Sequence, residues 1–191
     1  MKTTTTLFLL ATLLGLTSGC KTPLPTGSTS VKSPWNSFSE AKSSYDQIIP
    51  NQTTEVDLKK LGYDPFVNPG IKILSYLDVM QRFVPNSSVR AEMVPSEVRK
   101  FIETRDGYSA YELDLNYTKS ERYGNTLADM LSFSRKTKET GWNFRAIIVT
   151  NNNVVVYKVW SGQPNIERYD DKIKPLGPLQ TLDDIRPPIP F

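Results

Sequence analysis

The chain carries a single thiol, that of Cys20, and it has no histidine. Without histidine, Ser-His-acid and Cys-His nucleophilic arrangements and the usual zinc sites are excluded. Cys20 follows the apolar stretch Leu7 to Leu16 and the small residues Ser18-Gly19, and Lys2 is the only charged residue before it. This order is typical of a secretory signal, and the apolar stretch is shorter than the roughly 18–20 residues that span a bilayer. The sequence therefore singles out a thiol at the end of a signal peptide.

The last residues of this segment, Leu16-Thr17-Ser18-Gly19-Cys20, resemble the lipobox of bacterial lipoproteins, although Thr17 stands where that family more often has leucine. In that family the cysteine sulfur takes a diacylglycerol and the preceding peptide is removed. The resemblance implies lipidation of Cys20, and Lys21 after it implies delivery to the outer membrane, with the domain on the periplasmic face. An ordinary secretory signal with a free thiol is the alternative.

Composition divides the chain into four parts. Removal of a signal peptide 1–19 leaves 172 of the 191 residues, with 22 basic and 20 acidic side chains because Lys2 is lost. This balance requires no large basic face for nucleic acid or anionic lipid. Residues 20–35 are rich in Pro, Ser and Thr and predict a flexible tether. A globular domain 36–165 and a Pro-rich tail 166–191 follow.

The spacing of the apolar residues changes along the globular domain. Helix boundary signals and apolar spacings of three and four predict helices over 39–48, 55–61, 76–83 and 95–107. A short strand is predicted at 71–74, and the period then changes to two, which predicts strands at 111–117, 132–140, 142–148 and 154–160. The order predicts an α+β fold in which the N-terminal helices pack on one face of an antiparallel sheet of 3–4 strands. The expected inward-facing side chains are Tyr111, Leu113, Leu115, Phe144, Ala146, Ile148, Val156 and Val159.

Few side chains suggest catalysis. The sequence has no glycine-rich phosphate loop and no metal-ligand spacing, so we expect no cofactor, no metal and no enzymatic activity. Glu112 and Asp114 are conceivable as the two carboxylates of a glycan hydrolase, or as residues of a solvated strand face. Trp142 and Trp160 are conceivable as an aromatic groove for a glycan, or as part of the core.

The stretch from Ile48 to Thr54, followed by Val56, Leu58, Leu61-Gly62 and Pro65, resembles the signature of the SmpA/OmlA (BamE-like) family of small outer-membrane lipoproteins. The resemblance covers about 20 residues. Asn51 stands where the family usually has glycine, and two residues rather than one separate Gly62 from Pro65. It implies two helices packed on a three-stranded sheet and a role in outer-membrane assembly or maintenance.

The loop from Tyr63 to Pro69 is the predicted contact surface. Tyr63 and Phe66 stand on a proline-stiffened loop, where aromatic side chains present a preformed apolar patch or else pack the loop down. We therefore expect a lipid-anchored scaffold or binding protein of the cell envelope, with a protein partner and no small-molecule substrate. A glycan- or peptidoglycan-binding module is the alternative, and a two-carboxylate glycan hydrolase is a further one.

Overall fold

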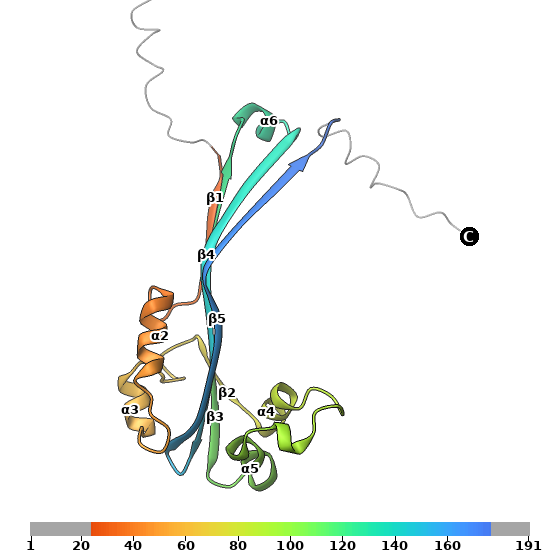
Figure 1. The fold of residues 1–191 in the computed structure, drawn as a ribbon. Coiled ribbons are helices and arrows are strands. Elements are labelled where there is room, and N and C mark those ends of the chain that lie inside the picture. Colours follow the sequence, from red (N-terminus) through yellow and green to blue (C-terminus); the bar gives the residue numbers. More distant parts are fainter. Residues whose placement is uncertain (1–23, 177–191) are drawn as a thin grey trace, which may run out of the picture. The chain divides into compact units, whose positions relative to one another are not determined.

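A five-stranded antiparallel sheet carries five α-helices in the computed structural model, which describes residues 24–176 (Figure 1). Cys20, the predicted signal peptide and residues 177–191 lie outside the described residues. Two compact units are present. The described part of unit 1 comprises residues 24–25, 122–136 and 171–176, and unit 2 comprises residues 26–121 and 137–170. The predicted α+β class is confirmed, with more strands than the expected 3–4.

The sheet has the order β1-β3-β4-β5, and β2 pairs with β3 as well. Residue 26 of β1 pairs with residue 121 of β3, and residue 71 of β2 pairs with residue 113, so the two short strands follow one another along β3. Gly141 lies inside β4, where we expected a break between two strands, and a Cβ atom at this position would lie 2.0 Å from the Tyr117 carbonyl oxygen. The close approach of β3 requires glycine here. The strands are β1 (Thr26–Ser30), β2 (Ile71–Leu74), β3 (Tyr108–Tyr123), β4 (Ser134–Asn151) and β5 (Val154–Ile173).

Side-chain caps begin most of the helices. The Thr54 and Ser75 hydroxyls each accept from the backbone N–H three residues later, and the aspartate there, Asp57 or Asp78, accepts from the cap backbone in return. This reciprocal capping box satisfies two N–H groups that a helix start leaves without partners. The helices are α2 (Phe38–Asp46), α3 (Glu55–Lys60), α4 (Tyr76–Phe83), α5 (Ser96–Thr104) and the short α6 (Thr126–Met130).

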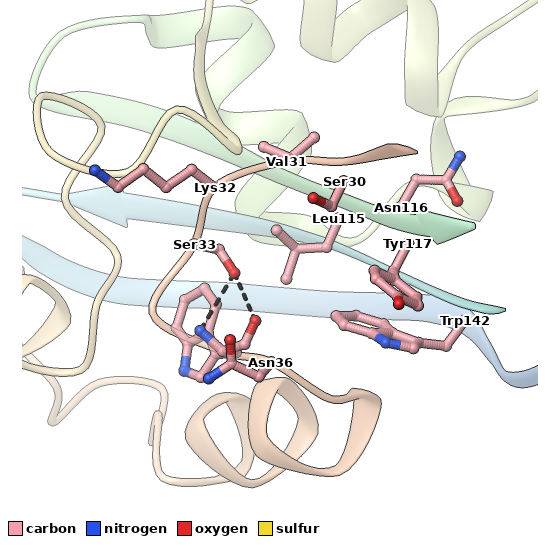
Figure 2. Close-up of a pocket in the computed structure, with 10 residues that line it drawn as sticks. Ser30, Val31, Lys32, Ser33, Asn36, Leu115, Asn116, Tyr117 and Trp142 are labelled. Atoms are coloured by element: carbon pink, nitrogen blue, oxygen red, sulfur yellow. Dashed lines mark hydrogen bonds between the residues drawn. The ribbon is translucent and has the colours of Figure 1, made fainter. Parts of the chain in front are cut away.

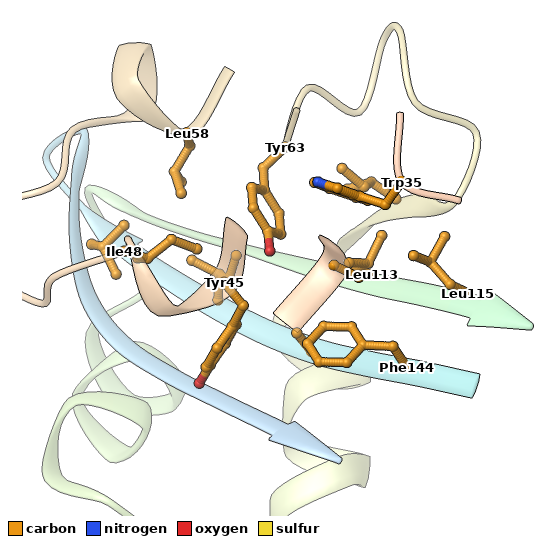
Figure 3. Close-up of a cluster of buried hydrophobic side chains, with 13 residues drawn as sticks. Trp35, Tyr45, Ile48, Leu58, Tyr63, Leu113, Leu115 and Phe144 are labelled. Atoms are coloured by element: carbon orange, nitrogen blue, oxygen red, sulfur yellow. The ribbon is translucent and has the colours of Figure 1, made fainter. Parts of the chain in front are cut away.

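One core cluster lies between the sheet of unit 2 and helices α2 and α3 (Figure 3). Leu113 and Leu115 of β3 are both buried in it, which confirms the predicted register of that strand. Phe144, Ala146 and Ile148 of β4 belong to the same cluster, and Tyr111 packs against it. These residues were predicted to face inward, and they do.

A second core cluster covers the opposite face, where α4 and α5 pack (Figure 1). It contains Ala110 of β3 and Val149 of β4, which alternate with the members of the first cluster because successive residues of a strand point to opposite faces. The expectation of helices on one face is therefore wrong for unit 2. The prediction that Val156 and Val159 face the core is also wrong. Val156 is only half-buried and Val159 is 37% exposed, whereas their neighbour Val155 is fully buried.

The predicted domain limits differ from the structure at both ends. Thr26–Ser30, expected in the flexible tether, form β1, although all five side chains are exposed. Pairing with residues 117–121 of β3 orders them, and Trp35, at the expected end of the tether, belongs to the first core cluster. At the other end, β5 continues to Ile173, past the expected start of the tail at residue 166.

Candidate functional site

The loop between α3 and β2 is held by its own hydrogen bonds. The Asp64 carboxylate accepts from the Phe66 N–H at 3.0 Å, and the Asp64 carbonyl accepts from the Asn68 N–H at 2.8 Å. The buried Asn68 side chain donates to the Gly62 carbonyl at 3.1 Å and accepts from the Gly70 N–H at 3.0 Å. An asparagine or aspartate that binds nearby backbone groups stabilises a turn locally. The loop is therefore preorganised.

Tyr63 anchors this loop to the core. Its side chain is 3% exposed, and its ring lies 5.0 Å from the Trp35 ring, centroid to centroid (Figure 3). Burial raises the pKa of the Tyr63 phenol because the charged form loses water. The prediction that Tyr63 contacts a partner is therefore replaced by the alternative that it packs the loop down.

Phe66 has the opposite environment. Its side chain is 84% exposed, and that of its neighbour Val67 is 80% exposed. Large apolar side chains that protrude together from a preorganised loop are candidates for a contact surface, whereas single exposed apolar residues are normal. Of the predicted pair, Phe66 therefore remains a candidate contact residue. Val67 is a second candidate, which the sequence analysis missed. We call residues 62–70 the contact loop.

Two cavities flank the contact loop. One of about 330 Å³ is lined by Val67 and by residues 32–34, and one of about 230 Å³ is lined by Phe66, Ile73 and Glu55. In the second cavity a Glu55 carboxylate oxygen accepts from the Tyr111 hydroxyl at 3.2 Å and from the Thr150 hydroxyl at 2.9 Å. Burial, and then the Glu55 charge, raise the pKa of Tyr111. This cavity therefore offers apolar walls beside one fixed carboxylate.

A third cavity, of about 400 Å³, lies between β3 and the segment after β1 (Figure 2). Its walls combine the Trp142 and Tyr117 rings with Asn36, whereas the Asn116 side chain lies on the face of β3 opposite Tyr117. The Ser33 hydroxyl donates to the Trp35 carbonyl at 2.8 Å and accepts from the Trp35 N–H at 3.2 Å, which fixes the wall formed by this segment. The mixture of aromatic faces with an amide and a hydroxyl-bearing segment suits a neutral polar ligand.

Trp142 and Trp160 do not line this cavity together. The Trp160 ring stacks on Phe144 at 5.7 Å between centroids and meets Phe38 edge-on at 6.0 Å. The Lys42 ammonium lies 4.9 Å from the centre of the Trp160 ring. Trp160 therefore belongs to the packing of β5 against α2, and only Trp142 remains as a candidate for ligand contact.

Glu112 and Asp114 are each paired with a different arginine. Glu112 is 8% exposed and binds the Arg82 guanidinium, while an Asp114 oxygen lies 2.7 Å from an Arg145 nitrogen. Glu112 was expected either as one of two catalytic carboxylates or on a solvated strand face, but α4 covers that face and supplies its partner Arg82. Because each carboxylate already has a cationic partner, the pair does not favour the glycan hydrolase alternative.

Among residues 24–176 no cluster of three or more potential metal ligands was found, and no helix there is long and apolar enough to cross a membrane. Cys20 lies outside these residues, so its lipidation stays a prediction. Comparison of the chain with protein-family models, with curated proteins and with solved structures found no match.

Proposed function

We propose that this chain is a lipid-anchored binding protein of the bacterial cell envelope, without enzymatic activity, that contacts a protein partner through the contact loop. The lipobox-like Leu16–Cys20 supports the anchor and Lys21 supports an outer-membrane, periplasmic location. The exposure of Phe66 and Val67 on a hydrogen-bonded loop carries the proposed contact. The family resemblance around Ile48 to Pro65 suggests a partner in outer-membrane assembly or maintenance.

The energetics favour this loop as a contact surface. Removing a Phe or Val side chain from water contributes roughly 1.5–3 kcal/mol each. Because hydrogen bonds from Asp64 and Asn68 already hold the backbone, little ordering entropy opposes that gain. The cavities on either side accept partner side chains, and Glu55 offers a carboxylate to a basic or N–H group of the partner. These features are typical of the central residues of a protein interface.

Site-specific photo-crosslinking in intact bacterial cells tests the proposal. A benzophenone amino acid replaces Phe66 in one strain and Met93, an exposed apolar residue of the same unit, in a control strain. We expect one discrete crosslinked protein from position 66 and none from position 93. Recovery of β-barrel assembly subunits supports the family resemblance. Identical products from both positions, or none from position 66, contradict the contact loop.

Glycan binding is the second candidate, favoured by the cavity of Figure 2. The Trp142 and Tyr117 rings can stack on the C–H face of a sugar while Asn36 binds its hydroxyl or acetamido groups. Soluble peptidoglycan fragments titrated into the protein provide the test. This candidate predicts binding that Trp142→Ala removes and Trp160→Ala keeps. The absence of binding to the unmodified protein rules it out for these fragments.

A further inference from the structure

Unit 1 places its charged and apolar side chains in an unusual way. Of its described residues, Leu24 is the only large apolar side chain that is buried, and the carboxylate-bearing Asp129 is buried as well. Seven large apolar side chains are exposed instead, among them Met130 at 73% and Leu127 at 70%. They are Tyr123, Leu127, Met130, Leu131, Phe133, Ile173 and Leu176. A surface this rich in apolar groups is typical of a site that meets another apolar phase.

Helix α6 aligns three of these side chains. Leu127, Met130 and Leu131 are spaced by three and four residues, so they share one face of the helix. The Asn125 side chain caps the helix by accepting from the N–H groups of residues 127 and 128 at 3.0 and 3.2 Å. The apolar face is therefore held in place at the turn between β3 and β4.

The chain after α6 adds Phe133 and Ile173 to the same unit. Ser132 adopts a left-handed conformation with φ of 59°, and the Phe133 N–H donates to the Ala128 carbonyl at 2.8 Å, which ends the helix. The Lys174 N–H donates to the Phe133 carbonyl at 2.8 Å. This bond brings residues 172–174 alongside Phe133.

Inside unit 1, the Asp129 carboxylate forms ion pairs with two arginines. One carboxylate oxygen lies 3.6 Å from an Arg122 nitrogen and 3.6 Å from an Arg135 nitrogen. This arrangement joins the end of β3, helix α6 and the start of β4 by charge rather than by an apolar core. The exposed apolar side chains are therefore not needed to hold the unit together.

Basic residues accompany the apolar face. The described residues of unit 1 contain five basic and two acidic residues, a net charge of +3. The whole chain also has a formal charge of +3, so its other residues balance to zero. Arg135, Lys172 and Lys174 line one small cavity together with Ser132. Exposed apolar groups beside clustered Lys and Arg side chains are typical of peptide segments that bind anionic membranes.

The position of Cys20 in the sequence supplies an independent argument. Leu24 and Pro25 belong to unit 1, and the Arg122 N–H donates to the Pro25 carbonyl at 3.4 Å. Leu24 is the fourth residue after Cys20, and four steps of an extended chain reach at most about 14 Å. A lipid on Cys20 would therefore hold unit 1 close to the headgroup region of the bilayer, whatever the conformation of residues 21–23.

We propose that the face formed by Leu127, Met130, Leu131, Phe133 and Ile173, which we call the tip face, inserts into the surface of a lipid bilayer, while Arg135, Lys172 and Lys174 bind anionic phosphate headgroups. The position beside the anchor rests on the proposed lipidation of Cys20. An acyl chain and a basic apolar surface are two complementary membrane signals, and two signals bind stably where one binds marginally. The tip face thus orients the anchored protein on the bilayer.

The experiment uses the chain from residue 20 with Cys20→Ser, which keeps every described residue and has no other cysteine. A new cysteine, Met130→Cys, carries the environment-sensitive dye NBD, and Glu103→Cys in unit 2 is the control position. Vesicles of three parts phosphatidylethanolamine and one part phosphatidylglycerol are compared with pure phosphatidylcholine vesicles. We expect brightening and a blue shift at position 130 only, with affinity about tenfold or more higher for the anionic vesicles.

Charge substitution within the tip face is the second test. The double variant Leu127→Glu with Leu131→Glu is expected to weaken binding of the unlabelled protein to anionic vesicles by at least about tenfold. Leu77→Glu with Met80→Glu on α4 of unit 2 makes the same change on exposed apolar residues elsewhere, and it is expected to leave vesicle binding unchanged. Equal binding by all three proteins overturns the proposal.

Other occupants of the tip face give different results. Dye at position 130 that is already shielded without vesicles, and becomes exposed when the chain is cut after residue 176, shows that the chain's own C-terminal residues cover the face. Shielding that grows with protein concentration shows a second copy there. Either result overturns the proposal. Because the Cys20→Ser protein carries no lipid, these vesicle experiments test the tip face independently of lipidation. Lipidation itself is tested by the mass of the wild-type amino-terminal peptide.

Discussion

The Arg82 guanidinium on α4 binds the Glu112 carboxylate on β3 through two hydrogen bonds. Nε donates to Oε1 at 2.9 Å, and Nη2 donates to Oε2. The bond to Glu112 raises the pKa of Arg82, so the guanidinium stays charged. This pair connects two elements that are 30 residues apart in the sequence, and it lies on the face of the sheet that also carries the second core cluster.

Arg82→Ala should destabilise unit 2, because it leaves the Glu112 carboxylate buried without its cation. The expected loss is about 2–3 kcal/mol in the free energy of unfolding, measured by urea denaturation. Arg145→Ala is the matched control, since its partner Asp114 is exposed and an exposed pair is worth roughly 0–1 kcal/mol. Equal losses in the two variants would contradict the buried role of Glu112.

Gly62→Ala should disrupt the start of the contact loop. Gly62 has a φ of 97°, and a Cβ atom there would lie 2.9 Å from both the Pro34 and Trp35 side chains. Because strain and overpacking add, we expect a loss of about 2–4 kcal/mol in the free energy of unfolding. Gly27→Ala serves as the control, since no atom lies within 4 Å of the added Cβ, and its effect should stay within about 0.5 kcal/mol.

Local signals predicted most of the elements of unit 2. The Thr54 and Ser75 caps, the Gly62 helix end and the asparagine turn before Val154 are chemical signals within a few residues, so the helices α3 and α4 and the β4–β5 hairpin follow from them. Strand β1 carries no such signal. Its five residues are small and polar, and it forms only because β3 offers it a free edge about 90 residues later.

The second core cluster could not be predicted for a related reason. An alternating strand predicts one buried face, but Ala110 and Val149 on the other face are too few and too small to mark it as buried. The charged Glu112 on that face even predicts that the face is exposed to solvent, because its partner Arg82 is distant in the sequence. Burial of the second face thus depends on where α4 and α5 dock, which is a tertiary property.

Tyr63 and Phe66 should respond oppositely to truncation, which tests the structure of the contact loop. Tyr63→Ala removes a buried ring that packs on Trp35, so a loss of about 3–4 kcal/mol in unfolding free energy is expected. Phe66→Ala removes an exposed ring and should change stability by less than about 0.5 kcal/mol, while it weakens partner crosslinking from a benzophenone amino acid at position 67. A large stability loss for Phe66→Ala would indicate that the loop packs differently.

The roles of these two aromatic residues could not be separated from the sequence. Both stand on the same short loop, and the alternatives of contact and packing were open for each. Trp35, 28 residues earlier in the sequence, decides the matter by packing on Tyr63, while Asp64 binds the Phe66 N–H and leaves that ring in solvent. Val67 was missed because its exposure depends on the same loop geometry.

The capping box of α4 should make stability depend on acid. Hydrogen bonds from the Ser75 hydroxyl and backbone, and then from Lys72, hold the pKa of Asp78 at about 2, below its usual 3.8. The folded protein therefore favours the charged carboxylate. Its stabilising contribution is complete above the unfolded pKa and is lost as the pH falls toward 2.

The NMR titration of the Asp78 carboxyl carbon measures this shift directly. In the Ser75→Ala variant we expect the midpoint to rise toward the usual value and the change in stability between pH 4 and 2 to become smaller. Ser43→Ala, an exposed position within α2, is the control and should leave both quantities unchanged. An Asp78 midpoint near 3.8 in the unmodified protein would contradict the capping geometry.

Lipidation of Cys20 is the prediction on which the proposed location depends. In a bacterial host the wild-type amino-terminal peptide should begin at Cys20 and carry the mass of a diacylglycerol and an acyl chain, and the protein should partition into the detergent phase. Cys20→Ser removes the sulfur that accepts the lipid, so both the added mass and the cleavage before residue 20 should be lost. Lys21→Asp tests the sorting signal and should move the processed protein to the inner membrane. A Cys20→Ser protein that is still cut before residue 20 would show an ordinary secretory signal, with the thiol free in the wild-type chain.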